Sequence, residues 1–388
     1  MDFKFSDEQI MIRDTAEAFL AEVSTSAAVR AAMVTERGYD PDLWARICTE
    51  MYWPAIHIPE QYGGLGLGYV ELVATLEQMG RRLLCAPFFA SVCLAGNALL
   101  VAGNDAQKGA WLPRLVAGSS ATLAFAGPQG GSDAAAVSVT CEQVGGRYRL
   151  NGVSRYVLDG HTAEWLVVAA RAPGSAGNSG VSLLVLEANT EGVSRQWLPT
   201  MDQTRKQAQI SFDDVWLDAD ALLGVEGESA SALETVLDLA RVALAADQVG
   251  GAQQSLDMTV DYLQERVQFG RSIASYQAVK HKCADMMVKV EAGRSALYYA
   301  ACIADEALAG SAQSSQLAEA ASIAKGYCSD AYFFNAGCGI QLFGGVGFTA
   351  EYDIQLYFKR AKSTETFLGN GDYHRQRLAR QLLDEETI

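Results

Sequence analysis

The hydrophobic pattern changes twice along the 388-residue chain, and this order is the strongest constraint on its fold. From Phe5 to about Gly118, apolar residues recur at helical spacing, and Ser6 followed by acidic residues suits the start of a first helix. Between about Ala121 and Gly224 the chain consists of short alternating runs rich in β-branched residues. After Ser229 the helical period returns and continues almost to the end. We therefore predict an α+β, mainly α fold in the order helix, sheet, helix.

The predicted strands lie in a small central β-domain. Gly145-Gly146 suits a hairpin turn between the first two strands, and Pro173 to Gly180 is a small-residue loop. The predicted domains are an N-terminal helical domain (1–120), the β-domain (121–226) and a C-terminal helical bundle (227–388). The runs with a strand pattern are Val137–Val144, Tyr148–Leu150, Leu166–Ala170, Val181–Leu186 and Gln209–Leu217.

The composition disfavours several classes of function. A net charge of −16 disfavours binding to nucleic acid or to an anionic membrane. Apolar runs such as Trp165–Ala170 are too short to span a bilayer, and the N-terminus has no signal-peptide pattern, so we expect a cytoplasmic protein. The eight cysteines form no CxxC pair and the four histidines no HExxH motif, so no metal site is predicted.

Two segments near the C-terminus are suited to binding a nucleotide, although each is also consistent with an ordinary helix end. In the first, Arg266 and Phe269 close a predicted helix, where the guanidinium is suited to a phosphate and the ring to packing on a nucleotide. The second, Ile340–Phe348, has three glycines between helices, where backbone can approach a ligand closely. No GxGxxG motif follows a strand and opens a helix, so a Rossmann-type site is not indicated.

Taken together and in order, motifs along nearly the whole chain resemble the acyl-CoA dehydrogenase family. The resemblance implies a tetramer of subunits with a helical domain, a β-domain and a C-terminal four-helix bundle, with FAD at a subunit interface. The implied reaction oxidises an acyl-CoA to the 2,3-enoyl-CoA, with a carboxylate removing the α-proton and FAD accepting hydride. The motifs are FSDEQ at Phe5, PEQYGGLGL at Pro59, GPQGGSD at Gly127, LNG at Leu150, RVQFG at Arg266, YQAVKHKCADM at Tyr276 and QLFGGVGFTAEY at Gln341.

The catalytic base of this family is missing from both of its usual positions. Leu368 in TETFLGNG stands where most members carry a Glu, and Ala240, beside Arg241, occupies the alternative position. Neither side chain accepts a proton, and loss of a general base typically costs about 100- to 10,000-fold in rate. Asp247 is the nearest replacement, on the same helix face as Ala240 but about 10 Å further along. It is either a catalytic base or a hydrogen-bonding group within the bundle.

The resemblance also implies that the FAD contacts are unevenly retained. The two β-domain segments that hold the flavin ring in the family here read Ala126-Gly127-Pro128 and Tyr156-Val157-Leu158, so both ring-binding hydroxyls are missing. Ser132 and Arg241 are candidate substrate or structural contacts, and Arg241 could instead pair with a helix carboxylate such as Asp238. The residues that reach the pyrophosphate and adenosine half of a neighbour's FAD are retained: Arg266, Phe269, Gln277, Gln341, Gly344 and Gly345.

This pattern predicts a chain that keeps the half-site it lends, meaning the residues that contact the diphosphate and adenosine of a neighbour's FAD. It has lost the half-site it owns, meaning the residues that would hold its own flavin ring. We interpret it as the subunit without the base in an α2β2 heterotetramer, like bacterial members that act on steroid side chains as CoA thioesters, which LCAPFFAS and AVKHKCADM resemble. The implied partners are a second acyl-CoA dehydrogenase subunit, a bulky acyl-CoA and an electron-transfer flavoprotein. One alternative is a self-sufficient homotetramer with Asp247 as base. Another is a non-redox module that binds a CoA ester or a partner protein.

Overall fold

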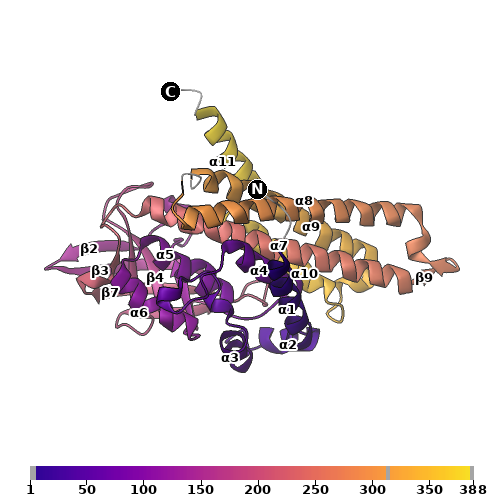
Figure 1. The fold of residues 1–388 in the computed structure, drawn as a ribbon, viewed down its shortest axis with the longest axis horizontal. Helices are drawn as coiled ribbons and strands as arrows, with labels where there is room; N and C mark the ends of the chain where they lie inside the picture. The colour runs from indigo at the N-terminus through magenta and orange to yellow at the C-terminus, as the bar shows by residue number, and fades with distance from the viewer. Residues whose placement is uncertain (1–5, 312–314, 385–388) are drawn as a thin grey trace. The chain divides into compact units, whose positions relative to one another are not determined.

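The computed structural model describes residues 6–311 and 315–384, and Figure 1 shows their helices and strands. The predicted class is confirmed, because helices precede and follow a single large sheet. None of the described helices is long and apolar enough to cross a membrane. The helices are α1 (Asp7–Val23), α2 (Ser26–Met33), α3 (Pro41–Thr49), α4 (Tyr69–Arg81), α5 (Asn97–Ala102), α6 (Asp105–Val116), α7 (Ala230–Glu265), α8 (Gln277–Leu308), α9 (Leu317–Phe343), α10 (Ile354–Thr366) and α11 (Gly371–Asp384).

Two compact units divide the chain. One contains the residues up to Arg30, Tyr69–Leu84 and the chain from Arg241 onward; the other contains Ala31–Gly68 and Cys85–Ala240. The strands are β1 (Ala121–Ala124), β2 (Thr140–Val144), β3 (Arg147–Leu158), β4 (Trp165–Arg171), β5 (Val181–Glu187), β6 (Val193–Leu198), β7 (Gln207–Leu217), β8 (Leu222–Leu223), β9 (Val267–Gln268) and β10 (Arg271–Ser272).

The predicted start of the first helix is confirmed in detail. The Ser6 hydroxyl accepts a hydrogen bond from the Gln9 backbone N–H at 3.2 Å, and the Ser6 N–H donates to the Gln9 side chain at 3.0 Å. This reciprocal pair satisfies two backbone groups at the helix end. Local sequence is therefore sufficient to fix where α1 begins.

The large sheet has the strand order β6-β7-β3-β2-β4-β5-β8, with β1 parallel to β4. The hairpin turn predicted at Gly145-Gly146 is confirmed: both residues have positive φ and join β2 to β3. Strands β1 and β6 are absent from the predicted set. β6 is an edge strand whose middle residues are exposed, and β1 is four residues long, so neither has the alternating pattern on which prediction depends.

Two glycines allow α4 and α7 to cross closely in the first unit. A Cβ added to Gly250 would overlap the carbonyl oxygen of Glu77, and one added to Gly80 would lie 2.6 Å from the Cα of Asp247. The Glu77 carboxylate accepts hydrogen bonds from Arg294 at 3.0 Å and the Tyr298 hydroxyl at 2.7 Å, which joins α4 to α8 as well. Glycine at this crossing therefore sets how closely the three helices pack.

Gly250→Ala is expected to destabilise the fold by about 1–3 kcal/mol, because the added methyl group meets backbone that cannot move away easily. Urea unfolding followed by circular dichroism measures this cost. The matched control is Gly109→Ala in α6, where an added Cβ meets no atom within 4 Å and helix propensity favours Ala by up to about 1 kcal/mol. Equal stability for the two variants would contradict the close crossing.

Candidate functional site

A short hairpin follows α7 and carries two of the predicted nucleotide contacts. β9 and β10 are joined by Phe269 and Gly270, with φ of 54° and 80°. Positive φ at both loop residues is the geometry of a tight type I′ turn, which Gly adopts freely and a bulky residue rarely adopts. The turn leaves the Phe269 ring 91% exposed at its tip. An aromatic ring held out into solvent at this backbone cost is typical of a binding surface.

Tyr276, just before α8, packs against the hairpin formed by β9 and β10. The Arg271 guanidinium lies 4.0 Å from the centroid of the Tyr276 ring, and the Phe269 ring meets the same ring edge-on at 6.5 Å. The Tyr276 hydroxyl donates to the Gln268 carbonyl at 3.4 Å. These contacts pack the Tyr276 ring against both strands of the hairpin and against the Phe269 ring.

The glycine-rich segment after α9 lies at the same end of the helices as this hairpin. Tyr262 near the end of α7 stacks on Phe343 at the end of α9, with centroids 4.2 Å apart, and its hydroxyl donates to the Phe343 carbonyl at 3.3 Å. Gly344 and Gly345 follow immediately, Gly344 with φ of 70°. A Cβ added to either glycine would meet no atom within 4 Å. The backbone at this point is therefore open to a ligand.

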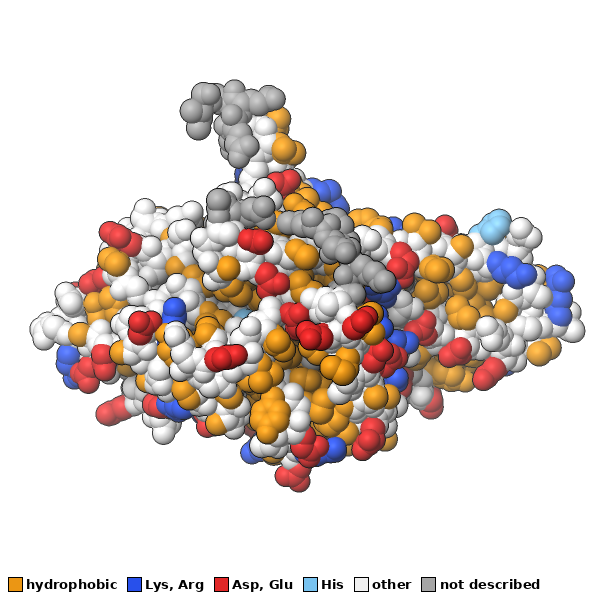
Figure 2. All heavy atoms as spheres, in the orientation of Figure 1, with side chains coloured by type: hydrophobic (Ala, Val, Ile, Leu, Met, Phe, Trp, Pro, Cys, Tyr) orange, Lys and Arg blue, Asp and Glu red, His pale blue; other side chains and the backbone are white. Residues whose placement is uncertain are grey.

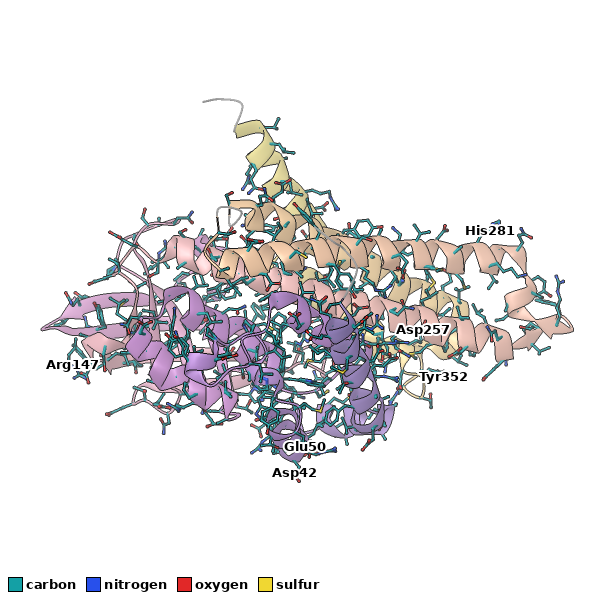
Figure 3. The ribbon with its side chains drawn as sticks, viewed as in Figure 1. Asp42, Glu50, Arg147, Asp257, His281 and Tyr352 are labelled. Atoms are coloured by element: carbon teal, nitrogen blue, oxygen red, sulfur yellow. The ribbon has the colours of Figure 1, made fainter. Side chains whose placement is uncertain are left out.

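The predicted contacts to a neighbour's nucleotide come from three segments at this end of the first unit. Figure 2 shows Lys and Arg side chains gathered there, and Figure 3 places His281 beside them at the start of α8. In a chain with a net charge of −16, this local basic group is suited to an anionic pyrophosphate. The six residues are all exposed: Arg266, Phe269, Gln277, Gln341, Gly344 and Gly345.

An open cavity of about 380 Å³ lies along α9 and includes Gln341. Asp330 at its far end is eleven residues earlier, a separation of about 16 Å along a helix. Between these polar ends the lining is aromatic or small, which leaves an apolar concave surface. The lining residues are Asp330, Phe333, Phe334, Gly337, Cys338 and Gln341.

The turn between α10 and α11 contains Leu368, the position at which the family resemblance predicts a base. Leu368 has φ of 60°, unusual for a residue other than Gly or Asn, and its side chain is 1% exposed. Its carbonyl accepts hydrogen bonds from Arg241 Nε at 3.3 Å and His374 Nε2 at 3.1 Å. The next carbonyl, of Gly369, accepts from Lys325 Nζ at 2.8 Å. Three basic side chains from three helices therefore fix the backbone of this turn.

All three basic groups are buried, and burial lowers the pKa of two of them, Lys325 and His374. Burial is the main cause, and the neighbouring positive charge of Arg241 the next, that lowers the pKa of Lys325 to about 7. Burial is the main cause, and Lys325 the next, that lowers the pKa of His374 to about 2. This imidazole is therefore neutral and donates through Nε2 to the Leu368 carbonyl. Lys325 also donates to the Ser329 hydroxyl at 2.7 Å. Lys325 and His374 are not among the residues predicted from the sequence, although a lone lysine within the small-residue run of α9 is a usable signal.

The remaining candidate base is bound to a guanidinium. Asp247 and Arg360 are each 1% exposed, and Arg360 Nη1 lies 3.3 Å from Asp247 Oδ1. Ala240, at the alternative base position, is fully buried. The geometry corresponds to the bundle-bonding alternative for Asp247, because its carboxylate joins α7 to α10. Arg241 is also fully buried, with its Nε on the Leu368 carbonyl.

The second unit contains the segments that resemble a flavin-ring site. Ala126 and Leu158 are 6% and 2% exposed, and neither offers a hydroxyl. Tyr156, on β3, is 40% exposed and has φ of 61° at an irregularity in the pairing of β3 with β7. Ser132 is partly exposed on a loop that Glu234 fastens by accepting the Ala134 N–H at 2.7 Å.

Comparison with known proteins identifies the family. Residues 6–119, 122–215 and 230–383 match the N-terminal, middle and C-terminal domain models of acyl-CoA dehydrogenase. The chain is 32% identical over 370 residues to the acyl-CoA dehydrogenase IpdE2 of Mycobacterium tuberculosis, covering 93% of each protein. The chain belongs to the acyl-CoA dehydrogenase family. Membership indicates FAD as the cofactor, which supplies the hydride acceptor when bound.

Two solved structures share this fold throughout. The ChsE4–ChsE5 complex from Mycobacterium tuberculosis gives a TM-score of 0.87 at 26% identity, covering 99% of each chain. A variant of the Tcur3481–Tcur3483 steroid ACAD gives a TM-score of 0.86 at 29% identity, covering 98% of this chain and 99% of that one. Both similarities extend over the helical parts and the sheet together.

The two parts of an FAD site differ in how well this acyl-CoA dehydrogenase chain fits them. The exposed basic and aromatic end of the first unit fits the anionic diphosphate and adenosine, because Gly344 and Gly345 leave backbone open and Arg266 is accessible. The ring segment of the second unit does not fit, because Ala126 and Leu158 are buried apolar residues.

Lys325→Met is expected to remove a pH dependence of stability. The unfolded chain holds the Lys325 proton up to about pH 10.5 and the folded chain loses it near pH 7, so the free energy of unfolding rises between these values. Urea unfolding at several pH values, compared with wild type, measures the slope. The control is Lys362→Met, whose side chain is 45% exposed and whose removal should leave the slope unchanged. An unaltered slope in Lys325→Met would contradict the depressed pKa.

Proposed function

We propose that this chain is the subunit without the catalytic base in a heterotetrameric, FAD-dependent acyl-CoA dehydrogenase. The complex converts a saturated acyl-CoA to the 2,3-enoyl-CoA, and the acyl group is bulky, of the steroid side-chain kind. This chain contributes the diphosphate- and adenosine-binding half of the FAD site whose ring half belongs to its partner. The observation that carries the proposal is the apolar, buried Leu368 on a turn whose backbone is nevertheless held by three basic side chains.

Both usual base positions support a chain that does not abstract the α-proton itself. Leu368 and Ala240 are buried and have no group that accepts a proton. Asp247 is engaged with Arg360 inside the helix bundle, and loss of one partner of such a pair leaves an uncompensated buried charge. In the proposed complex the partner subunit therefore supplies the carboxylate.

The exposed contacts at the end of the first unit support a site completed by another subunit. Arg266 and Gln277 are exposed within this chain, and the Phe269 ring is 91% exposed. An aromatic ring with this exposure, beside accessible guanidinium groups, is stabilised by burial against a neighbour that brings the rest of the nucleotide site. These exposed residues are therefore suited to completing the FAD site of a neighbouring subunit.

The substrate class and the further partners are inferred from relatives. The chain is similar to IpdE2, to one chain of the ChsE4–ChsE5 complex and to a steroid ACAD. We infer an acyl-CoA with a bulky ring system as the substrate, and an electron-transfer flavoprotein as the acceptor that reoxidises the reduced cofactor. We also infer an α2β2 assembly in the cytoplasm.

Flavin content with and without a partner is the direct test. The chain purified alone is expected to contain little FAD, whereas co-expression with a base-bearing acyl-CoA dehydrogenase subunit should give a yellow heterotetramer. Absorbance of released flavin per mole of protein, with mass from light scattering, measures both. One FAD per chain with turnover by the chain alone would instead establish the self-sufficient enzyme. A complex without flavin would favour a CoA-ester or partner-binding module.

Arg266→Ala is expected to lower the FAD content of the co-expressed complex several-fold, because it removes a charge-assisted contact to the diphosphate. Released-flavin absorbance measures the loss. Arg147→Ala is the matched control, since Arg147 is also exposed but lies on β3, outside the first unit. Equal FAD content in the two variants would remove Arg266 from the proposed half-site.

Asp247→Asn is expected to lower the melting temperature while turnover per bound FAD stays nearly unchanged. The substitution weakens the buried contact with Arg360 but removes no proton acceptor that the reaction uses. Thermal unfolding and a steroid-CoA assay with an artificial electron acceptor give the two readouts. A large loss of turnover with FAD retained would make Asp247 the base and overturn the assignment of that role to the partner.

A further inference from the structure

A bulge in β3 places a cation and an aromatic ring together in the segment that resembles a flavin-ring site. Ser154 pairs with Ile210 and Val157 pairs with Ala208, so Arg155 and Tyr156 together oppose one residue of β7. Neighbouring residues of a regular strand point to opposite faces, whereas a bulge redirects one of them. Here the Arg155 guanidinium lies 5.4 Å from the centroid of the Tyr156 ring.

The bulge is held firmly although its backbone is strained. Tyr156 has φ of 61°, a conformation that bulky residues rarely adopt. The Ala126 carbonyl accepts two hydrogen bonds at 2.9 Å, one from the Arg155 N–H and one from the Ser154 hydroxyl. Strain that is retained in this way is typical of sites where side-chain position matters.

Arg155 is folded against the domain rather than extended into solvent. Its Nε is buried and has no hydrogen-bond partner among the residues the structure describes. Among the described residues, the guanidinium is positioned by its cation–π contact with the Tyr156 ring rather than by an ion pair. The loop residue Gly130 packs close to the edge of the same ring, since an added Cβ would lie 3.6 Å from it.

Because Tyr156–Leu158 resembles a segment that holds the flavin ring, the Arg155 guanidinium over the Tyr156 ring would compete with a bound isoalloxazine for space. A guanidinium is planar and delocalised, so it stacks on an aromatic face as another flat ring would. An incoming isoalloxazine would have to displace it, and the two flanking positions, Ala126 and Leu158, offer no hydroxyl to bind the ring in return. The Arg155 side chain thus occupies the ring site, and the two hydroxyl groups that would bind the ring are absent.

We propose that Arg155 excludes the isoalloxazine ring from this chain's own half-site, so that each pair of subunits holds FAD only on the partner's ring site. This inference rests on the proposed function and assigns Arg155 as a specificity-determining residue. The exclusion leaves one complete flavin site per pair of subunits, the site whose ring half belongs to the partner.

Flavin stoichiometry of three co-expressed complexes tests the proposal. Wild type and Ala126→Thr/Leu158→Thr are expected to hold one FAD per pair, whereas the same double variant with Arg155→Met should double the FAD content. A second FAD per pair already in the double variant, with Arg155 retained, would show that the hydroxyls alone determine flavin binding and would overturn the role of Arg155. So would an unchanged content in the triple variant, provided that it forms a heterotetramer with wild-type mass.

Riboflavin binding by single variants keeps the proposal testable if the triple variant does not fold. Fluorescence quenching of riboflavin by the FAD-loaded complex should show binding about tenfold tighter for Arg155→Met than for wild type, because the stacked cation no longer competes. Arg149→Met is the matched control, since Arg149 lies on the same strand over Trp216 at 5.7 Å. Equal riboflavin affinity in all three complexes, or loss of FAD in Arg155→Met, would refute the exclusion.

The two levels of inference fail in different ways. FAD bound at full occupancy by the wild-type chain alone would refute the proposed subunit role. A wild-type complex that needs its partner for flavin but holds two FAD per pair would leave that role intact and refute the exclusion by Arg155. Flavin counts on the isolated chain and on the complex therefore separate the two.

Discussion

The grip of Arg241, Lys325 and His374 on two consecutive carbonyls is the interaction on which the C-terminal architecture depends. These side chains come from α7, α9 and α11, and they meet at the turn that joins α10 to α11. Two of them are cationic groups brought close together in the interior, an arrangement tolerated because the carbonyl oxygens of Leu368 and Gly369 face them. The turn is therefore defined by its backbone, and the side chain at position 368 can change without loss of the fold.

This separation of backbone from side chain explains how the chain retains the family fold with an apolar residue at position 368. A Glu at position 368 would be a chemical addition to a turn that is already held, whereas Leu fills the same place with an apolar group that is 1% exposed. The second unit follows the same logic, because the strained backbone of Tyr156 persists although Ala126 and Leu158 provide no hydroxyl. The backbone atoms thus define the fold at these two places, whereas the side chains determine which reaction groups are present.

The features that sequence predicted correctly are those determined by near neighbours along the chain. The Ser6 cap and the Gly145-Gly146 turn each depend on residues within a few positions, so a single stretch of sequence specifies them. By contrast, the Lys325 cluster and the bulge at Arg155 join residues from separate elements, and no local pattern encodes those meetings. Strand β6 was missed for the related reason that only its pairing with β7 defines it.

The position of Asp247 shows why a carboxylate near the alternative base position is not sufficient for catalysis. A general base must reach the α-carbon of a bound thioester, with the freedom to accept and release a proton there. Asp247 is instead enclosed where α7 crosses α4, with Gly80 against its backbone and Arg360 at its carboxylate. Moving it would open the glycine crossing and leave a guanidinium buried without its charge partner. The packing around Asp247 therefore ties its carboxylate to the helix bundle, which is why we propose that a second subunit supplies the base.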